Sequence, residues 1–161
     1  MKQMKQLYKI SILPLILIAF FVTFLTNSGM AKSRDYYQIQ VYRLTGKVQE
    51  EKMDNFLKNA YLPALHRAGI KSVGVFKPIE TDTTSGKRVY VWVPFTSLGH
   101  FAKIQDLLIK DVEFQKSGND FLGAPFDQVP FARKESILLR AFPDAPNFVL
   151  PKFQTAPSAR I

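Results

Sequence analysis

Apolar and polar side chains alternate along residues 36–44 (YYQIQVYRL), and this period of two is typical of a β-strand. Along residues 48–68, apolar side chains instead recur every three or four residues, which predicts an amphipathic helix. Pro63 lies within this segment and is expected to kink or split the helix, because proline lacks a backbone N–H and crowds the preceding turn. Gly69 suits the left-handed conformation that often ends a helix.

The next part of the pattern predicts a hairpin and a second helix. Residues 70–79 and 87–95 are rich in β-branched and aromatic side chains, and the polar segment between them ends in Gly86, so the two segments are predicted to pair. Ser97 is expected to cap the helix that follows. The apolar stripe of that helix consists of Leu98, Phe101, Ile104 and Leu108.

The remaining pattern predicts a shorter helical piece after a bend over residues 111–122, a loop over 123–130 and a last strand over 131–142. The predicted order is strand, helix, strand, strand, helix, strand, which is the ferredoxin-like α+β arrangement with a four-stranded antiparallel sheet. Right-handed crossover connections place both helices on the same face of such a sheet. The other face is left without a covering layer, and we expect it to need a partner.

The first 31 residues have the layout of a secretory signal peptide. Residues 1–9 carry three lysines and no acidic residue, residues 10–25 contain no charge, and residues 26–31 are polar or small, with Gly29 and Ala31 suited to cleavage. The alternative is an uncleaved membrane anchor, but the apolar run of 16 residues is shorter than the ~20 residues that span a bilayer. We therefore expect an exported protein, periplasmic or extracellular, with no membrane attachment after cleavage.

After this leader, the sequence predicts one folded domain and a tail. Residues 32–142 contain the predicted strands and helices, whereas residues 143–161 contain four prolines and no periodic pattern, as in a linker or extended tail. The chain has no cysteine, which excludes disulfides, thiolate chemistry and a lipid-modified leader. The stability of the domain must therefore come from its core.

The charge of the chain argues against a nucleic-acid partner. The formal net charge is +9, and removal of the three leader lysines lowers it to +6. The remaining basic side chains are scattered along the chain, without the clustering that is typical of a nucleic-acid footprint. We interpret them as part of a solvated surface.

Three segments resemble the NIPSNAP family. YYQIQVYRL is similar to the first strand of that family, with an aromatic pair before an acidic or amide residue and a later tyrosine. FLKNAYLPALHRAGIKSVGVF is similar to its first helix and second strand, and VYVWVPFTSLGHF is similar to its third strand and the start of its second helix. The resemblance covers residues 36–142. Gln38 departs from the family pattern, in which a glutamate is common at this position.

The resemblance implies a dimeric α/β barrel, in which two ferredoxin-like sheets pack against each other over their bare faces. It also implies that the domain is one of two tandem copies, as in bacterial exported members of the family, with residues 158–161 resembling the lead-in to a second copy. The activity of the family is not established. The resemblance therefore implies a fold and self-association, and it implies no reaction.

The predicted strands carry the candidate binding residues. We expect the helices to cover the face formed by Ile39, Val41, Val73, Val75, Val89, Val91 and Val93. The opposite face then carries Gln38, Gln40, Tyr42, Phe76, Arg88, Tyr90 and Trp92. These side chains either line a pocket for a small aromatic ligand or fill the interface between two paired sheets.

The two histidines give little support for metal or cofactor chemistry. His66 and Arg67 lie near the end of the first helix, where positive charge complements the helix dipole. Some dimeric α/β barrels degrade haem with a helix histidine, a tryptophan and an asparagine. His100 and Trp92 are the candidates for the first two roles, but no asparagine falls on a predicted strand. The sequence contains no metal-ligand, nucleophile or phosphate-binding motif, so we expect no metal and no cofactor.

Two functions remain open at this point. One is a non-catalytic binding or assembly module of the bacterial envelope. The other is a cofactor-independent monooxygenase acting on an aromatic substrate, or a haem-type enzyme. Both would use the same cavity, and no residue can be assigned a catalytic role, so the binding module is the preferred hypothesis.

Overall fold

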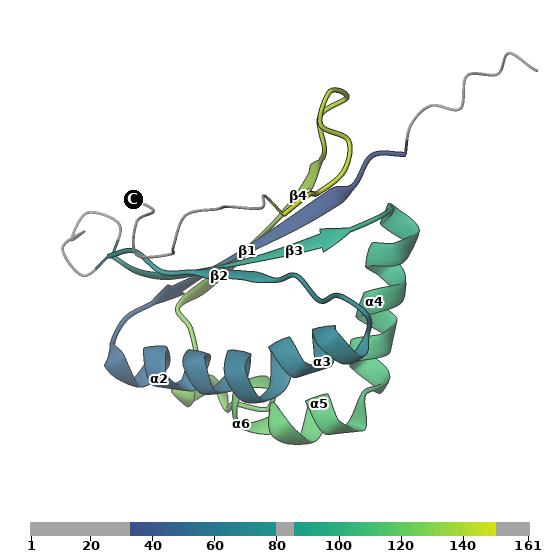
Figure 1. Ribbon diagram of the computed structural model, residues 1–161. Coiled ribbons are helices and arrows are strands. Elements are labelled where there is room, and N and C mark those ends of the chain that lie inside the picture. Colours follow the sequence, from purple (N-terminus) through teal and green to yellow (C-terminus); the bar gives the residue numbers. More distant parts are fainter. Residues whose placement is uncertain (1–32, 80–85, 151–161) are drawn as a thin grey trace, which may run out of the picture. The chain divides into compact units, whose positions relative to one another are not determined.

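The computed structural model of the protein describes residues 33–79 and 86–150 (Figure 1). The predicted signal peptide, the turn between the two hairpin strands and the end of the predicted tail lie outside these residues. Within the described ranges, no helix is both long enough and apolar enough to cross a membrane.

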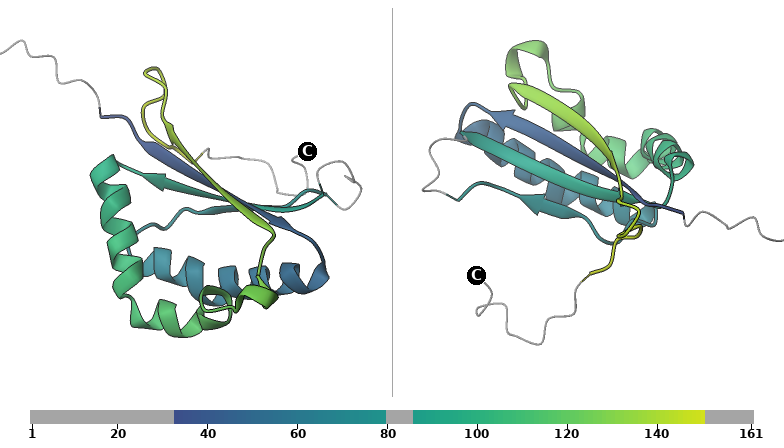
Figure 2. Two further views of the ribbon diagram at one scale, coloured as in Figure 1. Left: turned by 180° about the vertical axis from the view of Figure 1, so that it is seen from behind. Right: turned by 90° about the horizontal axis from the view of Figure 1, so that it is seen from above.

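An antiparallel sheet of four strands forms one layer of the domain, and the helices form the other (Figures 1 and 2). The spatial order of the strands is β2-β3-β1-β4. This order, with one helical segment after β1 and another after β3, confirms the predicted ferredoxin-like α+β fold. The strands are β1 (Tyr36–Leu44), β2 (Gly74–Phe76), β3 (Lys87–Phe95) and β4 (Arg133–Arg140).

The first helical segment runs without a break from Lys47 to Arg67. It consists of α2 (Lys47–Phe56), the π-helical turn η1 (Leu57–Tyr61) and α3 (Leu62–Arg67). The predicted split at Pro63 does not occur. The π-helical turn ends two residues before this proline, and the wider helix accommodates a residue that lacks a backbone N–H and crowds the turn before it.

The second helical segment bends at Asp111, as predicted. It consists of α4 (Leu98–Lys110), α5 (Val112–Ser117) and α6 (Asn119–Leu122), followed by the short 3₁₀ turn η2 (Phe126–Gln128). Ser97 caps α4, because its Oγ accepts a hydrogen bond from the backbone N–H of His100 at 3.0 Å. Asp111 has an extended backbone, and its Oδ1 caps α5 by accepting from the N–H of Phe114 at 2.9 Å.

The core lies between the helices and one face of the sheet. Val89, Val91 and Val93 of β3 are fully buried on this face, as predicted. The helices contribute Met53, Leu65 and Ile104, which are also fully buried. These six side chains lie at the centre of the hydrophobic core.

The predicted faces of β1 are wrong. Directly opposite residues of neighbouring antiparallel strands share a face, and Gln38, Gln40 and Tyr42 lie opposite the buried valines of β3. They are therefore under the helices, and all three are buried. Ile39 and Val41 instead lie opposite Trp92 and Tyr90, on the open face.

Candidate functional sites on the two faces of the sheet

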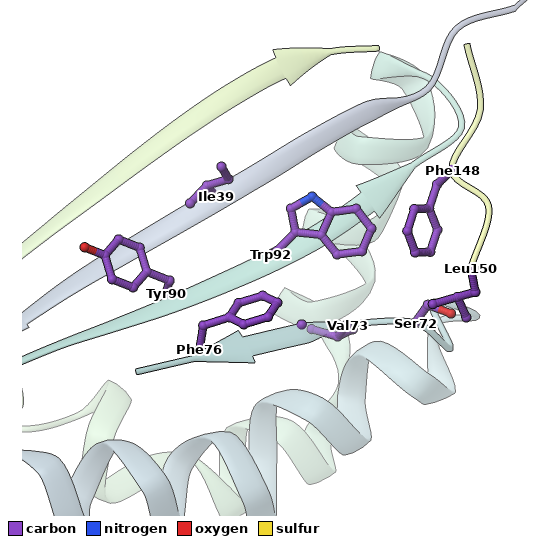
Figure 3. Close-up of a pocket in the computed structure, with 9 residues that line it drawn as sticks. Ile39, Ser72, Val73, Phe76, Tyr90, Trp92, Phe148 and Leu150 are labelled. Carbon is purple, nitrogen blue, oxygen red and sulfur yellow. The ribbon is translucent and has the colours of Figure 1, made fainter. Parts of the chain in front are cut away.

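The open face carries a cluster of apolar and aromatic side chains from three adjacent strands (Figure 3). Phe76, Tyr90 and Trp92 lie on this face, as predicted. Phe76 lies opposite Tyr90 in the pairing of β2 with β3, and Trp92 lies opposite Ile39 of β1. Four of the seven candidate residues, these three and Arg88, are thus on the open face.

Arg88 belongs to a row of three arginines at one end of the open face. It lies opposite Arg43 of β1, which in turn lies opposite Arg133 of β4. Glu135 pairs with two of the three, at 2.9 Å from Arg43 and 3.3 Å from Arg133. The row marks the charged boundary of an otherwise apolar face.

Part of the predicted tail packs against the domain. We call residues 143–150 the strap. Asp35 holds it: its backbone N–H donates to the carbonyl of Pro146 at 2.7 Å, and its Oδ2 accepts from the N–H of Phe148 at 2.8 Å. The ring of Phe148 lies over Trp92, with their centroids 4.5 Å apart. Beyond Phe142, the chain therefore contributes to the open face instead of leaving the domain at once.

An open groove of about 790 Å³ lies between the strap and the sheet on this face (Figure 3). Its walls are almost wholly apolar, and the hydroxyls of Ser72 and Tyr90 are its main side-chain polar groups. The lining residues are Ile39, Ser72, Val73, Gly74, Phe76, Tyr90, Trp92, Phe148 and Leu150. Such a surface favours apolar packing over the recognition of a charged or strongly polar group.

On the helix side, the other three candidate residues form a buried hydrogen-bond network. Gln40 is its centre: its Oε1 accepts from the hydroxyl of Tyr42 at 2.6 Å, and its Nε2 donates to Tyr61 at 2.7 Å and to Oε1 of Gln38 at 3.0 Å. The Nε2 of Gln38 then donates to Oγ of Ser136 at 2.8 Å. Burial of these amides is therefore compensated, since both groups of Gln40 have partners.

The network leaves one hydroxyl proton unused. Tyr61 accepts a hydrogen bond from Gln40, and among the described residues no acceptor is found for its own O–H. Tyr42, in contrast, donates its proton to Gln40. Tyr61 is only 6 % exposed, so this donor is available only to a group that enters the interior of the domain.

Both tyrosines are protonated at neutral pH, and burial raises the pKa of each further above its ordinary value. It raises the pKa of Tyr61 to about 12, although the hydrogen bond from Gln40 partly opposes this shift. Burial also raises the pKa of Tyr42 well above its ordinary value, and the neighbouring Tyr61 adds to this effect. Both side chains are therefore neutral hydrogen-bonding groups and not bases.

A cleft of about 530 Å³ that opens to solvent adjoins this network, and we call it the interior cavity because its inner end reaches Gln40, Tyr42 and Tyr61. Gln40, Tyr42 and Tyr61 supply polar groups, and Lys134 of β4 lies at its edge. The Nζ of Lys134 is 5.3 Å from the centroid of the Tyr42 ring, and partial burial lowers the pKa of this lysine. The remaining wall combines four phenylalanine rings with aliphatic side chains and two glutamines: Phe56, Gln105, Leu108, Ile109, Phe114, Gln115, Phe121, Leu122, Ala124, Pro130 and Phe131.

The histidine candidates do not form a site. His66 is exposed, and Arg67 pairs with Asp111 at 2.7 Å, which joins the two helical segments. Nδ1 of His100 lies 3.2 Å from the backbone N of Thr96, beside the start of α4. The His100 ring meets the edge of Phe95, which is buried on the helix side, so it does not share a face with Trp92 as the haem hypothesis requires. Within residues 33–79 and 86–150, no group of acidic or histidine side chains could hold a metal ion.

Four residues of these two sites are not among the candidates predicted from the sequence. Tyr61 and Lys134 reach the interior cavity from the first helical segment and from β4, and Asp35 and Phe148 hold the strap on the open face. Tyr61 stands next to the apolar stripe of its helix, so its buried position could have been recognised from the helical period. No local sequence pattern predicts the positions of Lys134 and Asp35 in these sites.

The fold and the two faces define the chain as a ferredoxin-like α+β protein with one sheet face covered by helices and one open. Solved structures of NIPSNAP family proteins have this fold. One from Agrobacterium tumefaciens has a TM-score of 0.52 at 15% sequence identity, with 68% of this chain and 90% of that chain covered. A NIPSNAP domain protein from Burkholderia xenovorans has a TM-score of 0.51 at 16% identity, with 73% and 99% covered.

A second NIPSNAP-like protein from Burkholderia xenovorans gives a TM-score of 0.51 at 14% identity, with 78% and 91% covered. No protein-family model matches the chain, and no curated protein sequence matches it either. The resemblance to NIPSNAP proteins is therefore confirmed at the level of the fold. The Agrobacterium protein has no known function, and both Burkholderia proteins are likewise uncharacterised.

Proposed function

We propose that this chain is an exported, non-catalytic assembly module that acts as a homodimer, with two copies packed through their open sheet faces. The observation that carries this proposal is the apolar open face. Phe76, Ile137 and Leu139 lie on it and are 59 %, 43 % and 43 % exposed, respectively. Together with Trp92 and Ile39, they form an apolar surface that extends over all four strands.

A second copy of the chain is the occupant that suits this surface. A sheet face with apolar side chains is stable when another layer covers it, and a large contiguous apolar patch is unusual on an isolated soluble domain. Two identical sheet faces can pack with twofold symmetry, since each supplies the same surface to the other. The arginine row lies at the end of the face, where its side chains can remain solvated.

The interior cavity supports a binding role over proton-transfer catalysis. No carboxylate and no histidine is among the residues that line it. Its two tyrosines are protonated at neutral pH, so neither acts as a general base. An enzymatic function would need a group that the described residues do not place there.

Light scattering tests the dimer. We expect about twice the chain mass at micromolar concentration for the protein recovered after export. Ile137→Glu should raise the monomer fraction, because it places a charge within the apolar surface of the proposed interface. Leu138→Glu is a matched control: Leu138 is the next residue, 45 % exposed, but on the helix side of the sheet. A wild-type monomer, or equal effects of the two substitutions, would contradict the proposal.

Fluorescence of Trp92, the single tryptophan, supplies an independent measurement of the same interface. Acrylamide quenching should decrease as the protein concentration rises through the dimerisation range, because the second copy covers the indole. Ile137→Glu should remove this concentration dependence. Leu138→Glu should preserve it.

Intact-mass measurement tests the proposed export. We expect protein from the native envelope to begin at or near Lys32, because the charged start, the apolar run and the small residues before Lys32 direct cleavage there. Recovery of the full-length chain in the membrane fraction would instead show that the leader is retained as an anchor.

A further inference from the structure

One end of the interior cavity carries a polar group that is held in place and can donate a hydrogen bond. Both N–H donors of Gln40 are used within the network, to Tyr61 and to Gln38, so Gln40 itself has no donor left for an anionic ligand. The hydroxyl of Tyr61 differs, because it accepts from Gln40 and keeps its own proton. Gln40 thus fixes the position of the Tyr61 oxygen and leaves its O–H free to donate.

Lys134 adds a positive charge to the same cavity. It lies directly opposite Tyr42 in the pairing of β1 with β4, on the helix side of the sheet. Within the described part of the chain, no carboxylate lies at ion-pair distance from its ammonium group, whereas Lys77 and Lys87 each pair with an acid. An anionic oxygen in the cavity would therefore meet an ammonium group that has no competing carboxylate.

The phenylalanine rings are the part of the wall that favours a flat, apolar ligand body. Phe56 and Phe121 are stacked with their ring centroids 4.0 Å apart, and Phe131 lies 5.8 Å from Phe121. These rings come from the first helical segment, from α6 and from the loop before β4. Aromatic rings pack well against another planar ring in an offset or edge-on geometry.

The cavity also has an entrance. β4 is an edge strand of the sheet, and Ser136 and Leu138 on its helix side remain exposed. Lys134 of β4 and Gln105 and Ile109 of α4 line the cavity from the two sides of this opening. A ligand can therefore enter between β4 and α4 without separating the helices from the sheet.

We propose that the interior cavity binds a small planar aromatic molecule with an anionic oxygen at one end, such as an aromatic carboxylate. The Tyr61 O–H and the Lys134 ammonium hold the anionic end, and the phenylalanine rings hold the aromatic body. The site lies entirely within one chain, so it does not depend on the proposed dimer. The sequence predicted a small aromatic ligand on the open face, and this proposal assigns it instead to the opposite side of the sheet.

Titration calorimetry with 2-naphthoate tests this site, with 2-naphthalenemethanol as the uncharged analogue. The purified protein should bind 2-naphthoate more tightly than the alcohol. Tyr61→Phe should weaken naphthoate binding about tenfold, the effect of losing one hydrogen bond to a charged group. Lys134→Met should weaken it at least as much and remove the preference for the carboxylate over the alcohol.

Phe76→Ser is the control for the other face. Phe76 lines the open groove and is exposed, so its loss should leave naphthoate affinity unchanged. Because Lys134 is at the edge of the cavity, Lys134→Met keeps the test valid even if Tyr61→Phe perturbs folding. Absence of naphthoate binding at 1 mM ligand, roughly the weak limit of specific recognition, would overturn the proposal. So would binding that Phe76→Ser abolishes and Lys134→Met leaves intact.

Discussion

Replacement of Val91 by aspartate is expected to lower the free energy of unfolding by about 3 kcal/mol or more. Val91 is 0 % exposed and lies in the middle of β3, between Gln40 of β1 and Val75 of β2. An aspartate at this position would place a carboxylate within the hydrophobic core under the helices. Urea unfolding followed by circular dichroism gives the change.

Arg88→Asp is the control on the same strand. Arg88 lies on the open face, at the end of β3, directly opposite Arg43. An aspartate there would face an opposite charge across the strands, so we expect a change below about 1 kcal/mol. Similar losses of stability in the two variants would show that the faces of β3 are assigned incorrectly.

Gln40→Leu is expected to lower the free energy of unfolding by about 2–3 kcal/mol, although leucine matches the size of glutamine and is more apolar. Gln40 is 4 % exposed and joins three other buried side chains. Its loss leaves the hydroxyl of Tyr42 without an acceptor and Oε1 of Gln38 without a donor. Tyr42 and Gln38 are both buried, so each group without its hydrogen bond carries a desolvation cost.

A double variant separates this effect from simple repacking. Tyr42→Phe removes the donor that Gln40→Leu leaves without a partner, so the double variant should recover about 1 kcal/mol relative to the sum of the two single changes. Gln105→Leu, a partly exposed position on α4, should have little effect. A Gln40→Leu protein as stable as the wild type would mean that the network does not contribute to the stability of the core.

The two proposals on this chain use opposite faces of one sheet and can be tested separately. Ile137→Glu acts on the open face and should change the mass of the assembly without changing naphthoate binding. Lys134→Met acts on the helix side and should change naphthoate binding without changing the mass. If the open face binds a different partner, the interior site is unaffected.

Local sequence signals determined the secondary structure well. The alternation in residues 36–44 defines β1, and Ser97 begins α4, because both signals depend only on neighbouring residues. Pro63 shows the limit of such reasoning. Its effect on the helix was predicted as a kink or split, whereas a π-helical turn before it keeps the helix continuous.

The faces of β1 were decided by tertiary structure. A period of two divides a strand into two faces but does not say which one is buried. The sequence alone favours burial of Ile39 and Val41, because isolated glutamines are costly to bury. The register with β3 places Gln38 and Gln40 beside Val93 and Val91 instead, and hydrogen bonds to Tyr42, Tyr61 and Ser136 remove the cost.

The composition of both candidate sites also depends on contacts between distant residues. Tyr61 and Lys134 are 73 positions apart in the chain, and Asp35 and Phe148 are 113 apart. No local period relates such residues, because they meet only after the strands have paired and the helices have packed. The sequence by itself determined the strands, the helices, the ferredoxin-like order and the aromatic side of β3. Only the tertiary structure decided which glutamines are buried, where the strap lies and which side chains surround the interior cavity.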